Sequence, residues 1–187
     1  MNSLWLATRA TGEISLVLFT VVTAMGVATT KGWASSRWPE SVITLLHRNL
    51  SLLSVVFLGL HISTTVIDTY VPIGWANVIV PFQTSYKTLW VGLGTIAFDL
   101  LAAVIITSLL RRRMPPRAWK AVHWTAYAMW AVAVVHSLGI GTDRLLTRIV
   151  ALAMVTLVGL AVVARAMTPH RQDDPVVSVR TRTEIRK

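Results

Sequence analysis

Cysteine is absent from this chain of 187 residues. Without a thiol, the chain cannot form disulfides, iron–sulfur clusters or zinc–thiolate sites, and it cannot attach a haem covalently through a CxxCH motif. Charge is scarce as well, since 14% of the residues are charged whereas soluble domains average about 25%. With 54% hydrophobic residues, this composition excludes an ordinary water-soluble globule.

Apolar stretches long enough to cross a bilayer core of about 30 Å recur along the sequence. Windows of about 19 residues predict five transmembrane helices, over residues 13–30, 41–66, 86–110, 118–141 and 144–166. Lipid offers the backbone no hydrogen-bond partner, so each span has to be helical. The predicted fold class is therefore an all-α membrane protein, with a five-helix domain over residues 1–166 and a basic, disordered tail over 167–187.

The limits of the spans carry recognisable signals. Pro39 before the second span and Pro115–Pro116 before the fourth suit the first turn of a helix, and Thr142 or Asp143 can cap the last span. The one long connection, residues 67–85, has an apolar middle, which predicts a short interfacial helix folded back on the bundle.

Basic residues outnumber acidic ones, 18 to 8. They cluster at the ends of apolar segments, which indicates membrane topology and argues against a nucleic-acid partner. Fourteen of the eighteen lie on the side that receives the C-terminal tail. By the positive-inside rule, the N-terminus faces out and the tail lies in the cytoplasm, which predicts a multi-pass protein of the inner (plasma) membrane.

Four of the five histidines fall within predicted spans, as two pairs. His47 and His61 are 14 residues apart on the second span, and His123 and His136 are 13 apart on the fourth, so the partners lie roughly 20 Å apart along each helix. Because both spans run from the cytoplasm outward, His47 matches His123 at an inner level and His61 matches His136 at an outer level.

Facing imidazoles on two helices are what a planar metal macrocycle held from both faces requires. Bis-histidine ligation fills both axial positions of a haem iron and suits electron transfer. The pattern predicts two bis-histidine b-type haems stacked through the membrane, one at each level. The alternative is four unrelated packing histidines, each bonded to a neighbouring carbonyl.

The angular spacing differs between the two pairs. On an ideal helix, 14 residues return to within about 40° of the starting face, whereas 13 residues leave about 140°. The fourth span must therefore bend, contain a wide turn, or present its two rings at different azimuths.

The two pairs stand in the stretches LHRNLSLLSVVFLGLH (46–61) and VHWTAYAMWAVAVVH (122–136), accompanied by RRRMPPRAWKAVHW and TRATG. Over residues 5–166 this resembles the ferric reductase-like transmembrane domain, the dihaem b core of NADPH oxidases and metalloreductases. The resemblance implies that His47 and His123 hold the inner haem iron and that His61 and His136 hold the outer one. It also implies an aromatic residue between the haems, which is Trp130 unless a shifted register places Met129 there. Trp130 is equally well explained as a packing residue that faces lipid or the core.

Haem propionates attract cations near the membrane interfaces. Arg9 on the outer side and Arg48 on the inner side are the main candidates, and each of the others is equally well a topology-setting charge. The others are Arg112, Arg113, Arg117 and Lys120 inside, and Lys87 and Arg144 outside.

Asp99 is the sole carboxylate deep in a span, where it could relay protons or, as we prefer, bond a neighbouring helix. Gly26, Gly92, Gly94 and Gly159 are interpreted as sites of close helix packing.

The resemblance implies electron transfer from a cytoplasmic donor to an outer-face acceptor, with no catalytic residue on the chain itself. Full-length relatives continue into flavin and nicotinamide domains, but here only the short segment 167–187 follows the last span. The expected donor is therefore a separate flavoprotein or a quinol, and the chain is the haem-carrying part of an oxidoreductase, either an oligomer or part of a larger complex. Two alternatives stay open, the dihaem anchor subunit of a quinone-linked respiratory complex and a haem-free scaffold or transporter.

Overall fold

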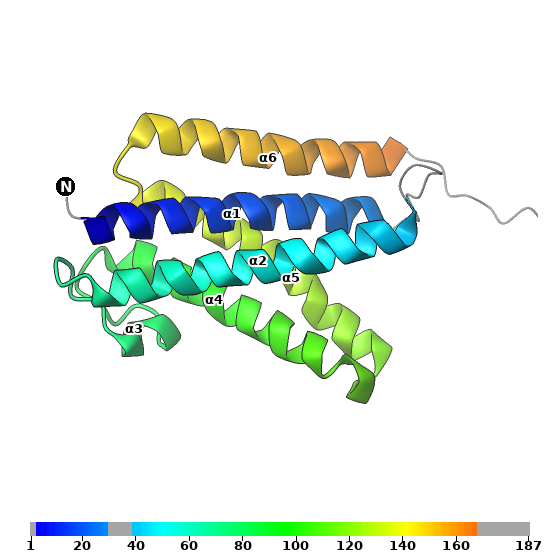
Figure 1. Cartoon of the computed structure of the whole chain (residues 1–187), viewed down its shortest axis with the longest axis horizontal. Coiled ribbons are helices and arrows are strands. Elements are labelled where there is room, and N and C mark those ends of the chain that lie inside the picture. Colours follow the sequence, from blue (N-terminus) through cyan, green and yellow to red (C-terminus); the bar gives the residue numbers. More distant parts are fainter. Residues whose placement is uncertain (1–2, 30–38, 168–187) are drawn as a thin grey trace, which may run out of the picture.

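The structure, a computed structural model, describes residues 3–29 and 39–167 of the chain. Within them it contains six α-helices and one 3₁₀ helix (Figure 1). These are α1 (Ser3–Thr29), α2 (Glu40–Ile67), α3 (Trp75–Ile79), α4 (Thr88–Leu109), η1 (Arg111–Arg113), α5 (Pro116–Ile140) and α6 (Arg144–Met167). The all-α prediction is confirmed, and the predicted tail lies outside the described residues from residue 168 onward.

Four helices in the described part of the chain are long and apolar enough to cross a membrane: α1, α2, α4 and α6. The chain is therefore a multi-pass membrane protein. The fifth predicted span corresponds to α5, which has 25 residues but falls short of the apolar character of the other four. Its crossing of the membrane, like the orientation of the termini, stays a prediction.

Helix α1 begins at Ser3, well before the predicted span. Arg9 and Glu13 limit the apolar run on its N-terminal side, but the helix continues through them. They stand one turn apart and pair at 3.4 Å on the helix surface. The extra turns place Thr8 and Gly12 beside the outer end of α2, where they contact His61.

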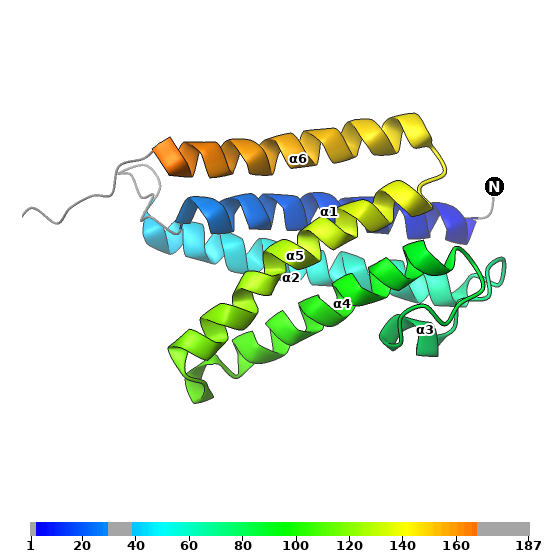
Figure 2. The same cartoon turned by 180° about the vertical axis from the view of Figure 1, so that it is seen from behind.

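The long helices form two antiparallel hairpins, α1 with α2 and α4 with α5, and α6 lies along α1 (Figures 1 and 2). Helix α1 is central, since it packs against α2, α5 and α6. Among the described residues, α2 packs closely on α1 but not on α5. In both views the α4–α5 hairpin diverges from α1 and α2 toward its η1 end.

The apolar core lies where α1 meets the other helices. One cluster joins α1, α5 and α6 around Leu16 and Met154, and a second joins α1, α4 and α5 around Phe19 and Met129. Between α1 and α2, small hydroxyl residues allow a close approach, and the Ser15 hydroxyl donates to the Ser54 carbonyl over 3.2 Å.

The connections follow several of the sequence signals. The predicted interfacial helix is α3, which packs on α4 through a bond of 2.7 Å from the Thr95 hydroxyl to the Asn77 carbonyl. Pro39 precedes α2, and the Asp143 carboxylate caps α6 by accepting from the Leu146 amide at 3.1 Å. Pro116 opens α5 at its first helical position.

Candidate functional site

The inner pair of histidines meets between α2 and α5. The ring centroids of His47 and His123 lie 6.5 Å apart, with the ring planes inclined by 56°. Two imidazoles that bind opposite sides of one metal ion, each at about 2 Å, would have centroids about 6 Å apart. The observed separation therefore leaves room for one ion between the rings, without a direct bond between them.

The outer pair is His61 on α2 and His136 on α5, which are near enough to interact electrostatically. His61 Nδ1 lies 2.8 Å from the Thr8 carbonyl of α1, and His136 Nδ1 lies 2.7 Å from the Trp90 carbonyl of α4. A carbonyl only accepts, so in both rings Nδ1 carries the hydrogen and Nε2 keeps its lone pair. This is the tautomer of an Nε2 metal ligand with a second partner that fixes the ring.

Each outer ring rests on a glycine of the neighbouring helix. A Cβ added at Gly12 would lie 2.7 Å from His61 Nδ1, and one added at Gly94 would lie 2.7 Å from His136 Cε1. Both distances are too short for any side chain, so only glycine lets these rings reach the backbone. In each case the glycine stands four residues after the carbonyl that accepts from the ring.

His47 has a looser form of this arrangement on α1, in which the space at the glycine would admit a Cβ. Its ring is hydrogen-bonded to the backbone of Val22, and four residues later a Cβ on Gly26 would meet His47 Cε1 at 3.9 Å. We call this combination of an accepting carbonyl and a glycine four residues later a histidine seat. Three of the four histidines have one, and the spacing from Gly12 to Gly26 equals the spacing from His47 to His61.

His123 is the exception. Its Nδ1 is buried and has no hydrogen-bond partner among the described residues. Instead, its ring stacks on Trp119, with the centroids 5.0 Å apart and the planes inclined by 23°. The Arg111 guanidinium lies over the same indole, 4.2 Å from its centroid.

The donor set indicates what kind of metal could bind. In the part of the chain that the structure describes, no three His, Asp or Glu side chains converge on one point. A bare transition-metal ion prefers about four ligands, so a histidine pair alone would leave it half-coordinated. A porphyrin supplies four equatorial nitrogens and needs only the two axial imidazoles that each level provides.

The spacing of the helices also suits a macrocycle. Helix α2 does not pack closely on α5 in the described residues, although the rings of His47 and His123 meet between them and His61 lies near enough to His136 to interact electrostatically. Because α5 is α-helical throughout, without a wide turn, the spacing from His123 to His136 is accommodated by different azimuths of the two rings or by a bend. The two histidine pairs thus fit two haems bound between α2 and α5, one at each level.

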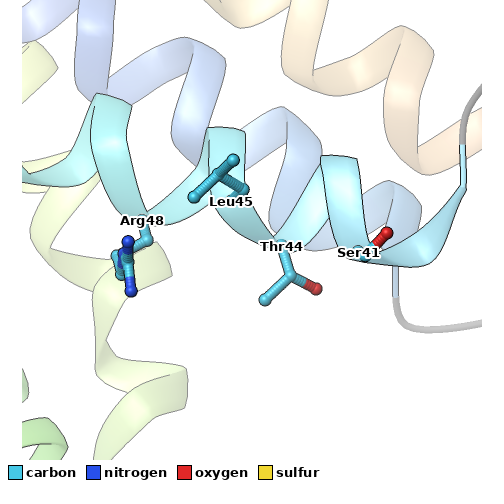
Figure 3. Close-up of a pocket in the computed structure, with 4 residues that line it drawn as sticks. All are labelled: Ser41, Thr44, Leu45 and Arg48. Carbon is cyan, nitrogen blue, oxygen red and sulfur yellow. The ribbon is translucent and has the colours of Figure 1, made fainter.

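Arg48 lies on α2 one residue after His47 and is exposed. It lines an open cavity of about 460 Å³ together with Ser41, Thr44 and Leu45 (Figure 3). A guanidinium and two hydroxyls near His47 are suitable partners for an anionic carboxylate such as a propionate.

Arg9 stands at the opposite end of the molecule, on α1. Its guanidinium donates to the Thr142 hydroxyl at 3.0 Å and to Glu13 at 3.4 Å, and it lies 5.4 Å from the centroid of the Trp5 ring. It therefore joins α1 to the connection between α5 and α6, one residue after the Thr8 carbonyl that holds His61.

The remaining cations differ in what they contact. Lys87 donates to the carbonyls of Gly139 and Ile140 at 3.2 and 3.4 Å, so its ammonium stabilises the C-terminus of α5. The others are exposed: Arg112, Arg113, Arg117, Lys120 and Arg144.

Trp130 is half-buried in the core and packs against both apolar clusters. Its indole N–H donates to the Thr20 hydroxyl of α1 at 2.9 Å. Met129 is buried against Phe19, Ala97 and Leu101. Both residues lie between the two histidine levels of α5, and Trp130 faces the core rather than lipid.

Two interpretations from the sequence differ from the structure. Asp99 is half-exposed on α4 and has no hydrogen-bond or ion-pair partner among the described residues, so the expected bond to a neighbouring helix is absent there. Gly159 faces open space, with no heavy atom within 4 Å of an added Cβ, and its interpretation as a packing site is wrong. Gly92 and Gly94 do allow close contacts, with the rings of Phe82 and His136.

Some site residues were missed from the sequence. The carbonyls of Thr8 and Trp90 carry no sequence signal, because every residue has one. Gly12 does have a signal, since its distance to Gly26 equals the distance between His47 and His61. Trp119 stands four residues before His123, which places the two side chains on one face of a helix.

Comparison with known proteins identifies one family. The family model described as "Ferric reductase like transmembrane component" matches residues 11–134, which is more than half of the chain. The matched range includes His47, His61 and His123 and ends two residues before His136. No curated protein and no solved structure matches the chain.

Proposed function

Because this chain belongs to the family of ferric reductase-like transmembrane components, we propose that it transfers electrons across the membrane through two b-type haems. The direction is from a donor on the cytoplasmic side to an acceptor on the outer face. The observation that carries the proposal is the meeting of His47 on α2 with His123 on α5, whose ring centroids lie 6.5 Å apart. The second pair, His61 and His136, comes from the same two helices and interacts electrostatically.

The residues of the chain bind and orient the two groups. His47 and His123 hold the inner haem, and His61 and His136 hold the outer one. Each bound haem supplies an iron that accepts and releases one electron without an open position for substrate. The histidine seats fix the rings of His47, His61 and His136, which lowers the entropy lost on binding.

Charged and aromatic side chains complete the two sites. Arg48 inside and Arg9 outside would pair with propionates at the two ends of the bundle. Trp130 would lie between the haems, held in place by its bond to Thr20. The assignment of the two haem levels to the cytoplasmic and outer sides is supported by the charge distribution, with fourteen of eighteen cations on the proposed cytoplasmic side.

Haem analysis of the purified protein tests the proposal directly. We expect pyridine haemochrome spectra to give two b-type haems per chain. A chain purified under adequate haem supply that contains none would overturn the proposal and favour a haem-free scaffold or transporter.

Removal of single ligands tests the pairing. His47→Ala or His123→Ala should reduce the haem content from two per chain to one, and the remaining haem should stay low-spin. His61→Ala and His136→Ala should give the same count but retain the other haem. Loss of both haems, or of neither, in the His47 variant would contradict the assignment of levels.

The donor is a separate flavoprotein or a membrane quinol, and reconstitution distinguishes them. In liposomes that contain the haem-loaded protein, the haems should be reduced by a reduced flavoprotein added on the side of the C-terminal tail. Reduction by quinol alone, with no effect of the flavoprotein, would instead assign the chain to a quinone-linked complex as its anchor subunit.

A further inference from the structure

The missing seat of His123 follows from the register of the α4–α5 hairpin. In the α1–α2 hairpin, His47 precedes His61 by 14 residues on α2. On α1, their partners are spaced equally: Val22 follows Thr8 by 14 residues, and Gly26 follows Gly12 by 14. Antiparallel helices rise equally per residue, so such steps have to match. The α4–α5 hairpin should obey the same rule, with the step back from His136 to His123 matched by an equal step forward along α4.

The seat of His136 consists of the Trp90 carbonyl and Gly94, and that equal step forward leads from them to Ala103 and Thr107. Thr107 stands at the depth where a seat for His123 would be expected. However, 13 residues also turn a helix by about 140°, so positions 103 and 107 do not share the face of α4 that presents Trp90 and Gly94. The Thr107 hydroxyl also donates to the Ala103 carbonyl at 2.7 Å, so that carbonyl already has a partner. Position 107 therefore provides no seat for His123, and His123 Nδ1 has no partner among the described residues.

Trp119 contacts the His123 ring, which lacks a seat of its own. Its ring stacks on His123 with an inclination of only 23°, one helical turn away on the same helix. Its own indole N–H is buried and has no partner among the described residues, so the contact is made by the ring face. Arg111 lies over this indole at 4.2 Å, a cation–π contact that restrains it in turn.

We propose that Trp119 is the positioning residue of the inner haem site, and that its stacked indole orients the His123 imidazole, which has no seat of its own. The inference rests on the proposed function, since His123 has to be an axial ligand. A ring that is stacked but not hydrogen-bonded at Nδ1 is a less basic ligand than the other three. The inner haem therefore depends on Trp119 for its ligand geometry, and the outer haem does not.

The test compares Trp119→Leu, which removes the ring, with Trp119→Phe, which keeps an aromatic face. Trp124→Leu is the matched control, because Trp124 lies on the same helix, is 54% exposed, and contacts Tyr127 rather than a histidine. The readouts are the low-spin electron paramagnetic resonance signals of the two ferric haems, their midpoint potentials, and haem content. His47→Ala and His61→Ala assign the signals to the two levels.

We expect Trp119→Leu to shift or broaden the inner signal and to lower haem content from two per chain toward one, while the outer signal stays unchanged. The unchanged outer signal also shows that the variant is folded. Trp119→Phe and Trp124→Leu should resemble the wild type.

An inner signal in Trp119→Leu with the position and amplitude of the wild type would overturn the inference. Equal loss of the inner signal in Trp119→Leu and Trp124→Leu would do the same, since it would indicate a general effect of removing a tryptophan. Neither result touches the proposed function, which fails only if the wild-type protein holds no pair of haems.

Discussion

Glycines under the histidine rings determine how closely a ring can approach the neighbouring backbone. At Gly12 and Gly94 an added methyl would lie 2.7 Å from the imidazole, so the ring would have to move or the helices would have to separate. The cost of such overpacking is about 1–3 kcal/mol, whereas alanine in place of a helical glycine gains up to about 1 kcal/mol. The two effects partly cancel in the free energy of unfolding. The displacement of the imidazole ring by the added methyl is not offset by either effect.

Gly12→Ala should therefore release the outer haem from an otherwise folded protein. We expect haem content to fall from two per chain toward one, with the inner haem retained and helix content by circular dichroism unchanged. Gly159→Ala is the control, because nothing lies within 4 Å of its added methyl. Two haems in Gly12→Ala, or equal losses in both variants, would show that the seat does not determine haem binding.

Arg9 tests the electrostatics of the outer site. Removal of a cation near an iron makes reduction less favourable, so Arg9→Ala should lower the midpoint potential of the outer haem more than that of the inner haem. The effect should be on the order of 1 kcal/mol, or about 40 mV for one electron, because Arg9 is partly exposed and screened. A redox titration in which both potentials shift equally would refute the placement of Arg9.

Single helices were largely predictable from the sequence, whereas the pairs in which they pack were not. Apolar length located α2, α4 and α6 within a few residues, and the apolar middle of residues 67–85 indicated α3. The start of α1 was not predictable from hydropathy, because Arg9 and Glu13 interrupt the apolar run although they pair with each other on the helix surface. Membership in a helix depends on backbone hydrogen bonds, which hydropathy does not measure.

The candidate site was predictable to the level of its histidines and no further. Their spacing indicated which rings share a level, since rise per residue is a local property of a helix. The seats are not local, because the approach of α1 to α2 and of α4 to α5 decides which carbonyl meets a ring. For the same reason the sequence did not indicate that Asp99 lacks a bond to a neighbouring helix among the described residues, or that Lys87 stabilises the end of α5.

Besides apolar packing, the contact between α1 and α5 in the described residues includes a hydrogen bond between side chains, from the Trp130 indole to the almost fully buried Thr20 hydroxyl. Thr20→Val keeps the shape but leaves the indole N–H without its acceptor. We expect a loss of about 1–2 kcal/mol in the free energy of unfolding, between the range for a buried unpaired donor and the smaller values found in membranes.

Unfolding in mixed detergent micelles measures this loss. Thr125→Val is the matched control, because the Thr125 hydroxyl donates only to the Val122 carbonyl of its own helix. Equal stabilities of the two variants would mean that Trp130 contributes to the α1–α5 contact by packing alone.

For the molecule as a whole, α5 decides the topology. It carries two of the four paired histidines and is the one long helix in the described residues that is not apolar enough to qualify as a span by composition. If α5 crosses the membrane, the connections on its two sides lie on opposite faces. If it does not, those connections share one face, and the direction of α6 is reversed relative to the prediction.

The absence of cysteine makes this measurable, since a single introduced thiol is the sole target for a membrane-impermeant maleimide. In intact cells we expect labelling of Tyr70→Cys, whose residue is 84% exposed between α2 and α4, and of Arg144→Cys at the start of α6. Arg112→Cys in η1 should react only after the cells are opened, because four basic residues close to it retain that connection in the cytoplasm. Equal access to Arg112→Cys and Arg144→Cys would place both ends of α5 on one face, and the two histidine levels could then not lie at different depths of the bilayer.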